Sequence, residues 1–176
     1  MVSQFASNLK PNDSSTAHQQ TFSLLVIGEI GKQTVDLALC YFYNCDNLTK
    51  FLLFFSGKHK DLSKINGLKN IIIESFNHNS EEVKSAASYA LGNISLGNLG
   101  DYVPFVLKEI QAQPKRQYLL LHSLKEIISA QSGSARSVQV LAPFVPAIWR
   151  QLFNHCECNE EGKKVHKFLL FSAQKL

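Results

Sequence analysis

The residues most able to bind a metal lie near the C-terminal end of the sequence. His155-Cys-Glu-Cys158, with His166 nearby, combines side chains that ligate zinc. Structural zinc sites usually pair a Cys-x-x-Cys motif with a second pair at a defined distance, whereas the spacing here is Cys-x-Cys. Cys156 with His122 lacks the motifs of a nucleophile–base pair. We interpret these cysteines as structural thiols and predict no metal, no cofactor and no catalytic residue.

The remaining candidates for a binding or catalytic site are two glycine pairs and two adjacent glutamates. Gly28-Glu-Ile-Gly31 and Gly97-Asn-Leu-Gly100 are too short for phosphate-binding motifs, and we expect them at helix ends, where glycine adopts left-handed backbone angles. Glu81 and Glu82 are adjacent, so on a helix their side chains point apart. We interpret them as solvated residues of a first helical turn and not as an acid–base pair.

The elements that position these residues follow a helical period. Residues 79–94 form the clearest segment, in which apolar side chains recur on one face. This stripe consists of Val83, Ala86, Ala87, Ala90, Leu91 and Ile94. Asn79 or Ser80 is a suitable N-cap, and the two glutamates complement the helix dipole. Because the stripe is rich in alanine, we expect a neighbouring helix to approach closely.

Further helices are predicted on both sides of this segment. The next one has Pro104 in its first turn and ends at Gln113-Pro114, and another covers residues 115–129. The remaining helices are expected near residues 22–31 and 65–76, from Pro146 onward, and over 160–171. Two aromatic runs, 37–43 and 51–55, are compatible with either a hairpin or a helix.

Internal repetition indicates how the helices are organised. Leu91-Gly-Asn-Ile-Ser95 and Leu124-Lys-Glu-Ile-Ile128 occupy equivalent positions in successive helices, 33 residues apart. Repeats of helix pairs with periods of about 40 residues are typical of armadillo and HEAT arrays. We therefore predict an all-α HEAT/armadillo-type superhelix of about four helix pairs. Its divisions are a first helix pair (1–36), an irregular apolar insert (37–60), HEAT-like repeats (61–162) and a divergent tail (163–176).

The bulk composition excludes several classes of protein. The 176 residues suit one compact domain, and 45% hydrophobic residues exclude wholesale disorder. The most apolar stretch, 37–55, is interrupted by Asp46 and Lys50, so we expect no transmembrane helix. No signal peptide is expected, and the four cysteines are then reduced thiols. We therefore expect a cytoplasmic or nuclear protein that contacts no membrane.

The middle of the sequence resembles a known family. Residues 80–95, followed by 102–110 and 113–129, closely resemble the cullin-associated, neddylation-dissociated family, also called TATA-binding-protein-interacting. The resemblance extends over about two-thirds of the chain, through the segments 22–35, 61–76, 148–149, 155–158 and 160–162. Residues 37–60 and those after Gly162 have no counterpart in the family pattern. These segments indicate either a natural truncated isoform or a gene model with intronic read-through.

The resemblance implies a non-catalytic function. Members of this family are long HEAT solenoids that wrap around cullin–RING ubiquitin ligases, bind cullins that lack the ubiquitin-like modifier, and promote exchange of substrate receptors. The resemblance therefore implies a cullin–RING scaffold as the partner. The alternatives are an adaptor that binds a transcription factor such as TATA-binding protein, or a truncated product without independent function.

The distribution of charge along the chain argues against a nucleic-acid partner and suggests a protein-binding face. The net charge of +4 gathers around the unmatched segments, since residues 32–69 carry +3 and residues 160–176 carry +2, while residues 80–130 are neutral. Lys115-Arg116 begins a predicted helix, where cations oppose the dipole, so the pair is either solvated or contacts an acidic partner. If the pair contacts an acidic partner, the outward positions on the second helix of each helix pair form a partner-binding face. That face consists of Lys84, Ser88, Arg116 and Lys125.

Overall fold

The computed structural model describes residues 2–9, 16–32, 61–63, 65, 67–132 and 139–155. Its helices are α1 (Val2–Ser7), α2 (Ala17–Lys32), α5 (Leu68–Ser75), α6 (Glu81–Ser95), α7 (Leu99–Ala112), α8 (Gln117–Gln131) and α10 (Val145–His155). Short 3-10 turns over Pro114–Arg116 and Ala142–Phe144 precede α8 and α10. The described part of the chain holds no strand, which confirms the all-α class. The expected insert 37–60, the helix over 160–171 and the tail 163–176 lie outside the described residues.

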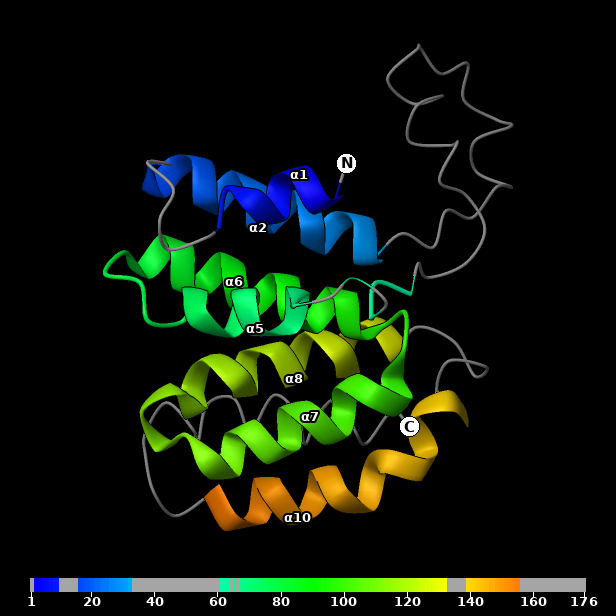
Figure 1. The fold of residues 1–176 in the computed structure, drawn as a ribbon. Coiled ribbons are helices and arrows are strands. Elements are labelled where there is room, and N and C mark those ends of the chain that lie inside the picture. Colours follow the sequence, from blue (N-terminus) through cyan, green and yellow to red (C-terminus); the bar gives the residue numbers. More distant parts are fainter. Residues whose placement is uncertain are drawn as a thin grey trace, which may run out of the picture.

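The helices are arranged in two layers (Figure 1). One layer consists of α2, α6 and α8, in which α6 packs against both of its neighbours. In the other layer, α1, α5 and α7 each pack on the helix that follows them, and α10 packs on α7. Successive helix pairs that contact only their neighbours are the arrangement of a HEAT-type solenoid, as predicted.

The buried stripe predicted for residues 79–94 is confirmed. All six of its members are at most 4% exposed, and they form one core cluster with residues from every described helix. Leu120 and Leu124 of α8 and Ile72 of α5 are buried too. The α6 helix is therefore the centre of the fold, since it buries one face against α2 and another against α8.

Of the four glycines expected at helix ends, Gly31 lies in the last turn of α2, Gly97 in the turn after α6 and Gly100 in the first turn of α7, whereas Gly28 lies inside α2. Gly31 is required by close approach: a Cβ at this position would lie 2.6 Å from the Ile94 Cα atom of α6. The expected left-handed backbone angles were wrong, because Gly67 is the one described glycine with a positive φ, and Gly28 and Gly31 instead let α2 approach α6 closely.

The predicted position of Pro104 is also wrong. The α7 helix begins at Leu99, and the Asn98 side-chain oxygen accepts a hydrogen bond from the Asp101 backbone N–H at 3.3 Å. Pro104 therefore lies in the second turn, where the bond to the Gly100 carbonyl is missing. Gly100 is exposed to solvent, and the helix continues past Pro104 to Ala112. Ser80 is the N-cap residue of α6, as expected, but its side chain makes no capping hydrogen bond.

Tyr102 of α7 is the largest fully buried side chain of the core. Its hydroxyl has no hydrogen-bond partner among the residues that the structure describes. Burial, followed by the negative charges of Asp61 and Asp101, raises the pKa of Tyr102 to about 12. The unfolded chain ionises near pH 10 at this residue, so stability from the neutral phenol is present below pH 10 and is lost as the pH rises toward 12.

We expect Tyr102→Phe to remove this alkaline dependence. The native chain should lose about 2 kcal/mol through Tyr102 between pH 10 and pH 12, whereas the phenylalanine variant should lose only what other groups contribute. Near pH 7 the two proteins should differ by less than about 1 kcal/mol, because no described hydrogen bond is removed. Urea unfolding of both proteins from pH 8 to pH 12 measures the difference, and identical pH slopes would contradict it.

Candidate functional site

A cleft of about 300 Å³ opens between α6 and α8, in the layer that consists of α2, α6 and α8. We call it the α6–α8 cleft. Its lining residues are Glu81, Ser85, Ser88, Tyr89, Tyr118, Leu119, His122 and Glu126. The two helices thus contribute two carboxylates, two phenol rings and one imidazole to a single concave surface.

Small residues bring the two helices together at the base of this cleft. The Ser88 hydroxyl donates to the Leu119 carbonyl at 2.9 Å, and the Ser123 hydroxyl donates to the Ser88 carbonyl at 2.9 Å. A Cβ at Gly92 would lie 2.8 Å from the Ser123 carbonyl oxygen, so only glycine fits there without a shift. Ser88 is 3% exposed, and the outward position predicted for it is wrong because its hydroxyl bonds the neighbouring backbone.

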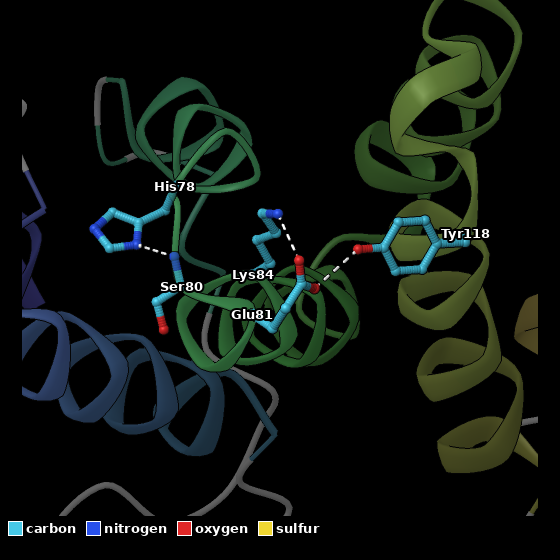
Figure 2. A network of polar contacts seen from close by, with 5 residues as sticks. All are labelled: His78, Ser80, Glu81, Lys84 and Tyr118. Carbon is cyan, nitrogen blue, oxygen red and sulfur yellow. Dashed lines mark hydrogen bonds and ion pairs between the residues drawn. The ribbon is translucent and has the colours of Figure 1, made fainter.

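Glu81 connects α6 with α8 at one end of the cleft (Figure 2). Its carboxylate accepts from the Lys84 ammonium at 2.7 Å and from the Tyr118 hydroxyl at 3.2 Å. These hydrogen bonds, first that from Lys84 and then that from Tyr118, lower the pKa of Glu81, and the same carboxylate raises the pKa of Lys84. Glu81 is exposed, as predicted for a residue of the first turn, but it also holds two partners.

Tyr89 defines the other end of the cleft. Its hydroxyl donates to the Glu29 carboxylate of α2, and the Lys32 ammonium lies 5.8 Å from the centre of its ring. Burial, followed by the Glu29 and Glu126 carboxylates, raises the pKa of Tyr89. Tyr89 of α6 therefore donates to a glutamate of α2, just as Tyr118 of α8 donates to a glutamate of α6.

Arg116 binds the end of a neighbouring helix, and its contact with a partner stays a prediction. Its guanidinium donates to the Ile73 carbonyl in the last turn of α5 at 3.4 Å, so its charge lies at the negative end of that helix dipole. Lys115 next to it is exposed. The unusual cationic pair before α8 is therefore explained by α5: one of its members binds the end of a neighbouring helix.

We expect Arg116→Met to lower the free energy of unfolding by about 1 kcal/mol, because the Ile73 carbonyl and the end of α5 lose a cationic donor. Lys115→Met is the matched control and should change stability by less than about 0.5 kcal/mol, because this side chain is exposed. Urea unfolding followed by circular dichroism compares the two variants. Equal destabilisation by both would contradict the role of Arg116 at the end of α5.

The other sequence candidates are placed only in part. Lys84 is partly buried beside Glu81, and Lys125 lies on α8, three residues from His122. Their contact with a partner stays a prediction. His122 is exposed in the cleft, whereas Cys156, Cys158 and His166 lie outside the described residues, as do Cys40 and Cys45. Within the described ranges, no group of three metal-ligating side chains is present, and no helix is long and apolar enough to cross a membrane.

Sequence reasoning missed Tyr89, Tyr118 and Glu126 as residues of one surface. A signal for them exists: on α6 the series Glu81, Ser85, Tyr89 has a spacing of four, and on α8 the series Tyr118, His122, Glu126 has the same spacing. Corresponding members of the two series are 37 residues apart, the separation of the Glu81–Tyr118 hydrogen bond. A comparison of polar positions at the repeat period finds this pairing, whereas a search for basic residues does not.

Comparisons with known proteins confirm the resemblance. The chain is 58% identical over 108 residues to cullin-associated NEDD8-dissociated protein 1 of Drosophila melanogaster, a match that covers 61% of the chain and 9% of that protein. It is 55% identical over 106 residues to the Arabidopsis thaliana protein of the same name, covering 60% of the chain and 8% of the relative. The Dictyostelium discoideum protein is 34% identical over 140 residues, which cover 76% of the chain and 11% of the relative.

The chain is therefore homologous to a segment of the cullin-associated NEDD8-dissociated proteins, and it spans about a tenth of the length of these relatives. No family model matches it.

Proposed function

We propose that this chain is a HEAT-type binding module that contacts a cullin and has a non-catalytic role in the assembly of cullin–RING ubiquitin ligases. The observation that carries the proposal is the 58% identity over 108 residues to a relative whose name states association with cullins. The two-layer helical array supports it, because solenoids of this kind bind partners through extended surfaces supplied by several repeats.

The size of the chain determines how strongly it should bind. A standard protein–protein interface buries about 1,600 Å² in total, and wrapping solenoids bury more than this. A chain that spans about a tenth of its relatives contributes only part of such a surface. We therefore expect binding in the micromolar range, with rapid dissociation.

A binding experiment with defined cullins tests the proposal. The full chain is immobilised and exposed to a purified cullin–RING complex, first unmodified and then conjugated to NEDD8. Because the relatives are named for dissociation from NEDD8, the unmodified complex should be retained and the conjugated complex should not. Retention of neither at 50 micromolar, or selective capture of TATA-binding protein in a parallel assay, would overturn the proposal.

A further inference from the structure

We propose that the α6–α8 cleft is a docking pocket for a single arginine side chain of the protein partner. This inference rests on the proposed binding function and specifies the chemistry of one contact. The cleft has a volume of about 300 Å³, at the lower end of the range for ligand pockets, and therefore suits one long side chain better than a cofactor.

The charge of the cleft selects a cation. Its two charged lining residues are both carboxylates, Glu81 and Glu126, and no lysine or arginine lines it. The Glu81 carboxylate already accepts hydrogen bonds from Lys84 and Tyr118. The Glu126 carboxylate forms no hydrogen bond or ion pair with the residues that the structure describes, so it is the group available to a cationic ligand. Behind Tyr89 the Glu29 carboxylate and the Lys32 ammonium, 5.8 Å from the ring centre, carry opposite charges, so the negative charge of the cleft comes from its own two carboxylates.

The aromatic residues of the cleft favour arginine over lysine. Tyr89 and Tyr118 are both partly buried and line the cleft from opposite helices. A planar guanidinium stacks on a phenol ring and donates two parallel hydrogen bonds to a carboxylate, whereas a lysine ammonium offers only a point charge. The exposed Ser85 hydroxyl supplies a further acceptor in the same cleft.

The backbone holds Glu126 in place for this contact. A Cβ at Gly92 of α6 would lie 2.6 Å from the Glu126 Cβ atom, so the absence of a side chain at Gly92 lets Glu126 lie directly against α6. The carboxylate is thus anchored at the base of its side chain while its oxygens remain available. A pocket that presents an anchored carboxylate and two phenol rings on one concave surface is preorganised for a guanidinium.

Titration with a blocked amino acid tests the pocket without any partner protein. N-acetyl-arginine amide is added to the isotope-labelled full chain, and amide shifts are followed by NMR. We expect saturable shifts centred on Ser85, Tyr89, His122 and Glu126, with half-saturation at millimolar concentrations. The neutral isostere N-acetyl-citrulline amide should bind at least threefold more weakly, and N-acetyl-lysine amide should lie between the two. Equal shifts from arginine and citrulline, or shifts spread over the surface, would overturn the proposal.

A matched pair of variants identifies the carboxylate. Glu126→Gln keeps the shape of the side chain and removes its charge, so the arginine affinity should fall about three- to fivefold, the range for a partly exposed charge pair. Glu74→Gln on α5 is the control, because Glu74 is exposed in the other layer, and its affinity should equal that of the unaltered chain. An unchanged affinity in Glu126→Gln would overturn the assignment.

The same two variants separate this inference from the proposed function. If the unmodified cullin complex binds the chain and Glu126→Gln binds it as well as Glu74→Gln does, the arginine pocket is wrong and the proposed function stands. If N-acetyl-arginine amide binds at the cleft but no cullin is retained, the pocket stands and the cullin partner is wrong. Loss of cullin binding in Glu126→Gln alone supports both.

Discussion

Gly31→Ala is expected to lower the free energy of unfolding by about 2 kcal/mol, although alanine is the better helix former. The added Cβ would lie 2.6 Å from the Ile94 Cα atom and 2.8 Å from its backbone nitrogen. Both contacts are with backbone atoms of α6, so no side-chain rotation relieves them and the helices must move apart. Overpacking of this kind costs about 1–3 kcal/mol, which exceeds the gain in helix propensity of about 1 kcal/mol.

Gly100→Ala is the matched control for this prediction. Gly100 is also helical, but a Cβ there would meet only the Asn98 side-chain oxygen, at 3.6 Å. This variant should therefore gain stability, by about 0.5–1 kcal/mol, through the helix propensity of alanine and the lower entropy of the unfolded chain. Urea unfolding of the two variants should give changes of opposite sign. Stabilisation by both substitutions would show that α2 and α6 are not held in close contact.

The contrast between these glycines shows how far the sequence alone reaches. The apolar stripe of α6 is predictable because helical periodicity is a local property, and its alanines correctly indicate a close neighbour. The identity of that neighbour is not local. Gly28 and Gly31 resemble a helix end in sequence, and only the position of α6 shows that they form the surface of α2 that contacts it.

In the candidate site too, local features are predictable from the sequence and contacts between helices are not. The exposure of Glu81 in the first turn is predictable from its place beside an N-cap, but its bond to Tyr118 joins residues 37 positions apart. Ser88 and Arg116 both look like outward polar residues in sequence. Each instead binds a backbone carbonyl of another helix, at Leu119 and Ile73 respectively, and such pairings depend on how the repeats stack. Comparing positions one repeat apart shows which residues of neighbouring helices pair, whereas the periodicity of a single helix does not.

Leu124→Ala is expected to produce the largest loss of stability, about 2–5 kcal/mol. Leu124 is fully buried in α8, and its truncation removes apolar contacts and leaves a cavity in the core shared with α6 and α7. In a solenoid each helix pair is stabilised mainly by its neighbours, so a weakened α8 also weakens the support of α6 and α7. Amide hydrogen exchange should therefore accelerate in α8 and in the helices that contact it, and less in α1.

Leu25→Ala separates this effect from the general loss of a leucine. Leu25 is 41% exposed on α2, so the same truncation there should cost less than about 1 kcal/mol and leave the exchange rates of α8 unchanged. Urea unfolding and hydrogen exchange of both variants provide the comparison. If Leu124→Ala were as mild as Leu25→Ala, α8 would not be part of a continuous core. The α6–α8 cleft, which depends on the close packing of these two helices, would then have no rigid base on which to bind a partner.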